Sequence, residues 1–324
     1  MVAKPKVAFY WCASCGGCEE AVVDLAEKIL DVVAAVDIVF WPVALDFKKS
    51  DVEAMPDKSI AVSFINGAVR MSEQEEMARL LRRKSGLVVA FGSCAHLGGI
   101  PGLANLTDRE SIFDWYYRKG PSVSGDGGAA PATKVTVPEG ELELPEFWDA
   151  AKALDQVIDV DYYLPGCPPT PKLLAEAVGA ILSGKSPPKG TVLAGTRALC
   201  HECDLNATKP AKLLISDVKR VTEVVIDPKT CYLAQGVICM GPVTRSGCEA
   251  LCIQGTMPCT GCFGPLDNAS DYGGKALSYI ASIVDITDEG EARKVMAKVA
   301  DPAGIFYRYS LPKSKLGRRR ARRK

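Results

Sequence analysis

The placement of cysteines constrains this chain more than any other feature of its sequence. Thirteen of its 324 residues are cysteine, and eight of these fall between Cys200 and Cys262. A segment with so many thiols is organised by metal–ligand bonds more than by an apolar core. We find no export signal before the first apolar strand, and no apolar run approaches the roughly 18 residues of a membrane helix. We therefore expect a cytoplasmic protein, in which cysteines serve metal binding rather than disulfides.

Composition and charge fit a globular protein with an unusual end. Hydrophobic residues make up 48% of the chain and charged residues 24%, and the length favours two domains. The net charge is zero, although residues 311–324 carry eight Lys and Arg and no acid. This basic tail is either a solvated, disordered end or an electrostatic anchor for a partner subunit or nucleic acid. Nothing else in the sequence indicates nucleic-acid recognition.

The first part of the chain alternates short apolar runs with helical periodicity. This alternation predicts an α/β fold with a doubly wound parallel sheet. A capping box formed by Ser72 and Glu75 is expected to open one of the helices. The expected strands are Lys6–Trp11, Val36–Val43, Ser59–Ile65, Leu87–Phe91 and Val160–Leu164, and the expected helices are Glu19–Val33, Glu73–Lys84 and Pro171–Leu182.

The regular pattern stops in two places. Between Asn105 and Ala150 it is interrupted, and the stretch Gly120–Pro131 is typical of an inserted loop. The stretch Ser183–Gly190 is a plausible domain boundary, after which the cysteines become dense. We therefore predict a first domain over residues 1–188, a cysteine-rich domain over 189–312 and the basic tail over 313–324.

Four N-terminal cysteines follow the ends of three expected strands. Cys15 and Cys18 follow the first strand, Cys94 the fourth and Cys167 the fifth. Loops at the carboxyl ends of parallel strands gather at one edge of the sheet. Four thiolates meeting there are what a 4Fe–4S cluster requires. Cys12 lies close to the end of a strand, and a buried free thiol explains it better than a ligand role does.

The C-terminal part contains eight cysteines, which is the number that two further 4Fe–4S clusters require. The main alternative is zinc, because paired Cys-x-x-Cys motifs also form tetrahedral zinc sites. An iron–sulfur protein is brown and a zinc protein is colourless, so the two are easily distinguished. These cysteines are Cys200, Cys203, Cys231, Cys239, Cys248, Cys252, Cys259 and Cys262.

Three other polar residues adjoin the cysteine motifs. His96 is expected to be a polar loop residue near the first cluster, and His201 is placed to hydrogen-bond a cluster sulfur. Glu19 directly follows Cys18. An acid in the first turn of a helix is favourable for electrostatic reasons alone. The alternative is that Glu19 is a proton relay near the first cluster, which makes it the candidate catalytic residue.

These motifs resemble those of the small subunits of NiFe hydrogenases, and the likeness extends from Val7 to about Pro312. It is closest to the methyl-viologen-reducing branch that accompanies heterodisulfide reductase. The segment Phe306–Pro312 also resembles the C-terminal end of that family. The motifs are Cys15-Gly-Gly-Cys18-Glu19, Gly92-Ser-Cys94, Gly98-Gly-Ile-Pro-Gly102, Pro165-Gly-Cys-Pro-Pro169, Cys239-Met-Gly-Pro242 and Pro258-Cys-Thr-Gly-Cys-Phe-Gly-Pro265.

The resemblance implies a flavodoxin-like domain with a proximal 4Fe–4S cluster and a C-terminal domain with a medial and a distal one. Cys15, Cys18, Cys94 and Cys167 would hold the proximal cluster. Cys200, Cys203, Cys231 and Cys239 would hold the distal cluster. Cys248, Cys252, Cys259 and Cys262 would hold the medial cluster. A swap between the last two sets stays open, and Cys12 matches no ligand position.

The function that the resemblance implies is electron transfer within a hydrogenase complex. Electrons from H2 oxidation at a NiFe large subunit would cross this chain to a further iron–sulfur or flavin subunit. In an alternative with the same fold, the chain would be an electron-relay subunit of a heterodisulfide-reductase-type or complex I-like assembly. The large subunit of that assembly would have no H2 chemistry. A zinc-binding scaffold without redox activity is the third reading, and it does not explain the cysteines at the strand ends.

Overall fold

The computed structural model describes residues 4–124, 130–184, 187–267 and 269–320. Its centre is a five-stranded, wholly parallel sheet with the strand order β2-β1-β3-β5-β9. This is the flavodoxin-like order, with a switch point between β1 and β3. The expected α/β fold with a doubly wound parallel sheet is therefore confirmed. The strands are β1 (Lys6–Trp11), β2 (Asp37–Phe40), β3 (Ile60–Asn66), β5 (Ser85–Phe91) and β9 (Tyr162–Leu164).

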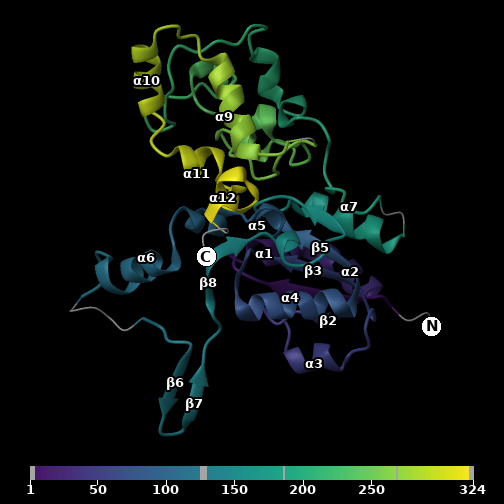
Figure 1. The fold of residues 1–324 in the computed structure, drawn as a ribbon. Helices are drawn as coiled ribbons and strands as arrows, with labels where there is room; N and C mark the ends of the chain where they lie inside the picture. Colours follow the sequence, from purple (N-terminus) through teal and green to yellow (C-terminus); the bar gives the residue numbers. More distant parts are fainter. Residues whose placement is uncertain (1–3, 125–129, 185–186, 268, 321–324) are drawn as a thin grey trace.

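Helices cover both faces of this sheet, which is why its strands are apolar throughout (Figure 1). Side chains of α1 (Gly17–Val23) and α7 (Pro171–Leu182) pack on one face. Side chains of α3 (Lys49–Ala54) and α4 (Ser72–Lys84) pack on the other. The bounds of α7 are those that the sequence predicted, with Thr170 as a side-chain cap at its start.

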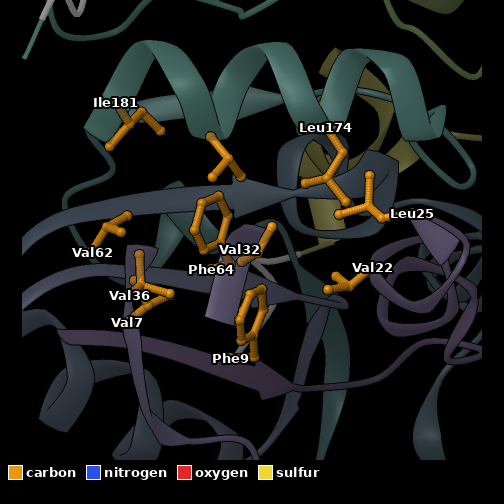
Figure 2. Close-up of a pocket in the computed structure, with 11 residues that line it drawn as sticks. Val7, Phe9, Val22, Leu25, Val32, Val36, Val62, Phe64, Leu174 and Ile181 are labelled. Atoms are coloured by element: carbon orange, nitrogen blue, oxygen red, sulfur yellow. The ribbon is translucent and has the colours of Figure 1, made fainter. Parts of the chain in front are cut away.

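A small cavity lies between α7 and the sheet (Figure 2). Aliphatic and aromatic side chains of β1, β3 and α7 line it, among them Phe9, Phe64 and Leu174. Its lining contains no thiol and no charged group. It is therefore an imperfection in the packing of the core and not a candidate site.

The prediction of one long helix over Glu19–Val33 is wrong. The chain forms three short pieces instead, because Ala26 adopts a left-handed φ of 51° and interrupts the helix. Val22 and Leu25 are buried as expected, whereas Leu30 is exposed. The pieces are α1 (Gly17–Val23), η1 (Ala26–Lys28) and α2 (Ile29–Ala35).

The capping box expected from Ser72 and Glu75 is also wrong. Gln74 takes that role, because its side-chain oxygen accepts hydrogen bonds from the backbone N–H groups of Arg70 and Met71. The Ser72 hydroxyl instead accepts a bond from the backbone of Glu146. A tertiary partner has therefore replaced the local one.

Residues 105–150 hold more structure than the sequence indicated. Strand β4 (Val69–Met71) pairs with β8 (Phe147–Lys152), and β6 (Lys134–Val137) pairs with β7 (Gly140–Glu143) in a hairpin. Figure 1 shows α6 (Arg109–Asp114) and this hairpin projecting from the body. A π-helical turn, η3 (Trp115–Lys119), follows α6. Of the expected loop Gly120–Pro131, residues 125–129 lie outside the described part of the chain.

The C-terminal part consists of short helices and turns around its own core (Figure 1). Its chain then returns to the sheet, where Gly99 donates to the Tyr309 carbonyl and Gln156 donates to the Pro312 carbonyl. The elements of this part are η5 (Leu199–His201), η6 (Asp204–Thr208), η7 (Leu233–Gln235), η8 (Gly241–Val243), α8 (Leu251–Gln254), α9 (Tyr272–Ile283), α10 (Glu289–Ala297), α11 (Pro302–Phe306) and η9 (Leu311–Lys313). Three short helices of the first part of the chain complete the description, namely α5 (Gly92–Leu97), η2 (Ile100–Leu106) and η4 (Leu154–Gln156).

The basic tail begins as a helix rather than as disordered chain. Helix α12 covers Lys315–Arg320, and the Ser314 hydroxyl accepts a bond from the Gly317 backbone. Residues 321–324 lie outside the described part of the chain, so the anchor role stays a prediction. Among the helices that the structure describes, none is long and apolar enough to cross a membrane.

Candidate metal centres

The four N-terminal cysteines come together at the carboxyl edge of the parallel sheet. We call Cys15, Cys18, Cys94 and Cys167 the sheet-end group. Cys15 is in the turn after β1, Cys18 in the first turn of α1, Cys94 in α5 and Cys167 directly beyond β9. Cys18 and Cys94 are buried, whereas Cys15 is exposed. The strand-end argument from sequence therefore placed all four in one site.

The thiols of the sheet-end group are close enough to influence one another's ionisation. Burial raises the pKa of Cys18, and the neighbouring charges of Cys94, Cys167 and Cys15 raise it further. Burial, followed by Cys167 and Cys15, likewise raises the pKa of Cys94 to about 12. Four thiolates together are therefore unfavourable unless a cation compensates them, which is what an iron–sulfur cluster does.

Glycines make room for the thiols at this edge. A Cβ atom on Gly92, whose φ is 82°, would overlap the Cys18 sulfur. A Cβ atom on Gly99, whose φ is 57°, would lie 2.6 Å from the Cys94 Cα. At both positions the backbone approaches a thiol as closely as only glycine allows. The donor set and the space around it thus fit a bound cluster.

We expect Gly92→Ala to displace the Cys18 thiol and to lower the iron content of the purified protein. The added methyl group both overlaps the sulfur and disfavours the left-handed backbone at this position. Gly179→Ala is the matched control: it lies within α7 and has no atom within 4 Å of the added carbon. It should stabilise the protein by about 0.5–1 kcal/mol. Equal iron contents in the two variants would contradict the expectation.

The eight C-terminal cysteines separate into two groups of four, each lining its own small cavity. The outer group consists of Cys200, Cys203, Cys231 and Cys239. The middle group consists of Cys248, Cys252, Cys259 and Cys262. These are the two sets that the resemblance implied. At the outer group, a Cβ on Gly241 would contact the sulfurs of Cys200 and Cys239 at 3.4 and 3.6 Å.

The three groups follow one another through the molecule. Cys262 of the middle group lies beside Cys167 of the sheet-end group, and Ser93 donates to both the Gly166 and the Cys262 carbonyl. Cys259 of the middle group adjoins Cys239 of the outer group. The Met240 amide also donates to the Cys259 carbonyl at 2.9 Å. The middle group therefore connects the other two.

The side chains of these groups do not converge as the ligands of a single bound ion do. Among the described residues, no three or more His, Cys, Asp or Glu side chains surround one point at which a single metal ion would sit. In a tetrahedral zinc site all four sulfurs lie about 2.3 Å from one ion.

Hydrogen bonds around the middle group were not visible in the sequence. The Cys259 thiol is 3.7 Å from the Thr244 hydroxyl, which in turn contacts the Tyr272 hydroxyl at 2.6 Å. The Glu202 carboxylate accepts bonds from the backbone N–H groups of Gly247 and Cys248. Such groups orient ligands and tune the potential of a cluster. The only signal for Glu202 and Thr244 was their position close to cysteines.

Glu19 is buried, with 4% of its surface exposed, directly beside Cys18. Burial raises its pKa to about 7, although hydrogen bonds from Trp41 and Asn66 act in the opposite direction. The indole N–H of Trp41 donates to one carboxylate oxygen and the Asn66 amide to the other at 2.5 Å. Neither donor accepts and passes on a proton at neutral pH. These contacts support a positioning role, and the proton relay stays a prediction.

The remaining expectations had mixed outcomes. His96 lies within α5 and is buried against the Tyr163 ring at 4.7 Å, so the expected loop position is wrong. Burial, with Lys313 and Arg245 nearby, holds the pKa of His96 well below its usual value. His201 is exposed. Cys12 is buried on the face of the sheet that packs against α4, opposite to the face where Cys18 packs.

Comparison with known proteins gives one matching family model. It is described as NADH ubiquinone oxidoreductase, 20 Kd subunit, and it matches residues 15–181. This range contains the whole sheet-end group and ends at the last turn of α7.

Several relatives match nearly the whole chain, and two of them are described here. The iron–sulfur subunit of the F420-non-reducing hydrogenase of Archaeoglobus profundus is 42% identical over 310 residues, which are 95% of this chain and 96% of that protein. The corresponding F420-non-reducing hydrogenase subunit of Methanothermobacter thermautotrophicus is 34% identical over 96% of both chains.

Among solved structures, a chain of the NiFeSe hydrogenase from Desulfovibrio vulgaris Hildenborough has a similar fold. The TM-score is 0.51 and the identity 18%, and the match covers 82% of this chain and 95% of that one.

Proposed function

We propose the function of this chain from one premise: it belongs to the family of hydrogenase iron–sulfur subunits that includes those of the F420-non-reducing hydrogenases. Members of this family are oxidoreductase subunits that act within a complex. We infer that this chain is the electron-transfer small subunit of a NiFe-hydrogenase-type complex. It would carry electrons from H2 oxidation at a partner large subunit to a further iron–sulfur or flavin subunit, of the kind found with heterodisulfide reductase.

We further propose that the chain binds three 4Fe–4S clusters. The sheet-end group would hold the proximal cluster, the middle group the medial one and the outer group the distal one. Bound clusters of this type supply one-electron redox chemistry. The observation that carries the proposal is the division of twelve cysteines into three adjoining groups of four. All thirteen cysteines lie in the described residues and none forms a disulfide, which suits a cytoplasmic complex.

The protein's own part is to hold and surround these centres. It brings four thiols to one sheet edge, keeps Cys18 and Cys94 away from water, and leaves Cys15 exposed. Burial of this kind controls solvent access and therefore the potential of a cluster. The exposed side of Cys15 is where we place the large subunit. We also propose the division into domains at residues 188 and 312, although Tyr309 and Pro312 contact the first domain.

Purification of the complex under anaerobic conditions tests this function. We expect about twelve irons per copy of this chain beyond those of its partner subunits, no stoichiometric zinc, and H2-dependent reduction of methyl viologen. The preparation should be brown. A content near four irons, or one zinc per group of cysteines, would contradict the three clusters.

A second candidate function rests on the family model, whose description refers to NADH ubiquinone oxidoreductase and which ends at residue 181. In that case, the chain would relay electrons beside a large subunit without H2 chemistry. The complex would then contain the same iron but would not reduce methyl viologen with H2. The large subunit would also lack the two Cys-x-x-Cys pairs of a NiFe site.

A further inference from the structure

A groove of about 300 Å³ crosses the surface of the C-terminal part of the chain. Three of the segments that form its walls are 218–221, 237–240 and 257–260, and a fourth runs from Lys298 into α11. Its floor is apolar, since Val218, Val237 and Val299 are buried there. Met257 lies in the wall and is 47% exposed.

The rim of this groove is positively charged. Lys219, Arg220, Lys298 and Arg308 line it. Of these four side chains, only Lys298 forms an ion pair within the described part of the chain, with Asp217 at 2.6 Å. Asp217 also lies close to Lys219, and the Glu223 carboxylate accepts a bond from the Arg220 backbone. The one acid in the lining, Asp301, already caps α11 by accepting a bond from the Gly304 backbone at 2.8 Å. Arg308 uses its Nε to donate to the Gly304 carbonyl. The lining thus carries four cationic side chains and one acidic one around an apolar floor, in a chain whose acids and bases balance. We call it the cationic groove.

The cationic groove lies where two of the cysteine groups meet. Cys259 of the middle group is part of its lining. Met240 is also in the lining, next to Cys239 of the outer group, and its amide donates to the Cys259 carbonyl at 2.9 Å. Met257 is two residues from Cys259 in the sequence, and Met240 is one residue from Cys239. A partner side chain that contacts either methionine therefore lies close to a proposed cluster ligand.

We propose that the cationic groove is the docking site for the protein that accepts electrons from this chain, and that this partner presents an acidic segment with an apolar side chain. The proposal rests on the proposed electron-transfer function. Electron-transfer partners commonly form small interfaces that are steered by opposite charges. Here the charge surrounds an apolar floor whose walls include residues adjoining two proposed cluster ligands. An acidic carboxylate would pair with Lys219 and Arg220, and an apolar side chain would cover Met257.

Charge reversal at the rim tests this site. The complex of this chain with its large subunit is purified anaerobically, and an acidic bacterial-type ferredoxin serves as the probe. We expect Lys219→Glu/Arg220→Glu to raise the Kd for ferredoxin at least ~10-fold at low salt and to remove most of its salt dependence. The KM for ferredoxin under H2 should rise in parallel. The rate with methyl viologen, a small cationic dye, should stay within about twofold of the unaltered complex.

A matched control makes the result specific. Lys212→Glu/Lys275→Glu changes the charge by the same amount at two exposed lysines outside the groove. It should leave the Kd for ferredoxin near that of the unaltered complex. Absence of saturable ferredoxin binding, or an equal loss of affinity in both double variants, would overturn the proposal. Binding is measured without turnover, so a complex that binds ferredoxin normally but lacks H2 activity would refute the proposed function and leave the docking site supported.

Discussion

Cys18→Ala is expected to remove one cluster and to abolish H2-dependent electron transfer through the complex. Cys18 is buried beside the thiols of Cys94, Cys167 and Cys15. A 4Fe–4S cluster normally needs four protein ligands, so the iron content should fall by about four per chain. We expect methyl viologen reduction under H2 to fall to background while the complex still assembles. Iron analysis and the visible spectrum of the same anaerobic preparation measure both effects.

Cys12→Ala provides the control for this variant, because the two cysteines belong to the same loop region but to opposite faces of the sheet. Cys12 packs with Tyr10 against the α4 side, and its backbone donates to the Asn66 carbonyl at 2.8 Å. Removal of its sulfur leaves a small cavity and should lower the free energy of unfolding by about 1 kcal/mol. Iron content and activity should be unchanged. Loss of iron from Cys12→Ala, or full iron in Cys18→Ala, would show that the sheet-end group is assigned wrongly.

Asp161→Asn is expected to be strongly destabilising although it lies away from the cysteines. The Asp161 carboxylate is buried at the start of β9 and is held by Arg82 at 2.6 Å and Lys189 at 2.6 Å. It also accepts a hydrogen bond from the Val88 backbone at 2.8 Å, which ties β9 to β5. Lys189 is largely exposed, but Arg82 is mostly buried, so removal of the carboxylate leaves the Arg82 charge uncompensated, at a cost of about 3 kcal/mol. The apparent melting temperature of the complex should fall by roughly 6–12 °C.

The same contacts predict how stability depends on pH. Burial opposes ionisation of Asp161, but hydrogen bonds from Lys189, Arg82 and the Val88 backbone outweigh it and lower the pKa of the carboxyl. A carboxyl with a lowered pKa in the folded state contributes stability above its unfolded pKa of about 3.9 and loses it as the pH falls further. The difference in melting temperature between the unaltered complex and Asp161→Asn should therefore be full at pH 7 and shrink below about pH 4.

Glu53→Gln is the matched control for Asp161→Asn. Glu53 is exposed and lies 3.8 Å from Lys49 on the surface of α3. An exposed pair of this kind contributes less than about 1 kcal/mol. The melting temperature of the Glu53→Gln complex should stay within a few degrees of that of the unaltered complex at every pH. A similar loss in both variants would mean that Asp161 does not have the structural role described here.

The sequence was most informative where structure depends on neighbours along the chain. Alternating apolar runs predicted the five strands of the sheet, and the helix expected over Pro171–Leu182 has the bounds of α7. It was least informative where a local signal met a stronger tertiary partner. Ser72 bonds to Glu146 rather than capping its own helix, and the fold breaks the helical pattern at Ala26. The pairing of β4 with β8 joins residues about 80 positions apart, which no local pattern encodes.

By itself, the sequence determined that this chain carries thiols at strand ends and in a dense C-terminal set, because cysteine spacing and strand periodicity are local properties. It did not determine how the eight C-terminal cysteines divide, since no regular element orders that segment. The tertiary structure brings Cys200 and Cys203 to Cys231 and Cys239, places Cys262 beside Cys167, and builds the cationic groove from four separate segments. These contacts join residues far apart in the sequence. Closing the loops between them costs conformational entropy, which only the packing of the folded chain offsets.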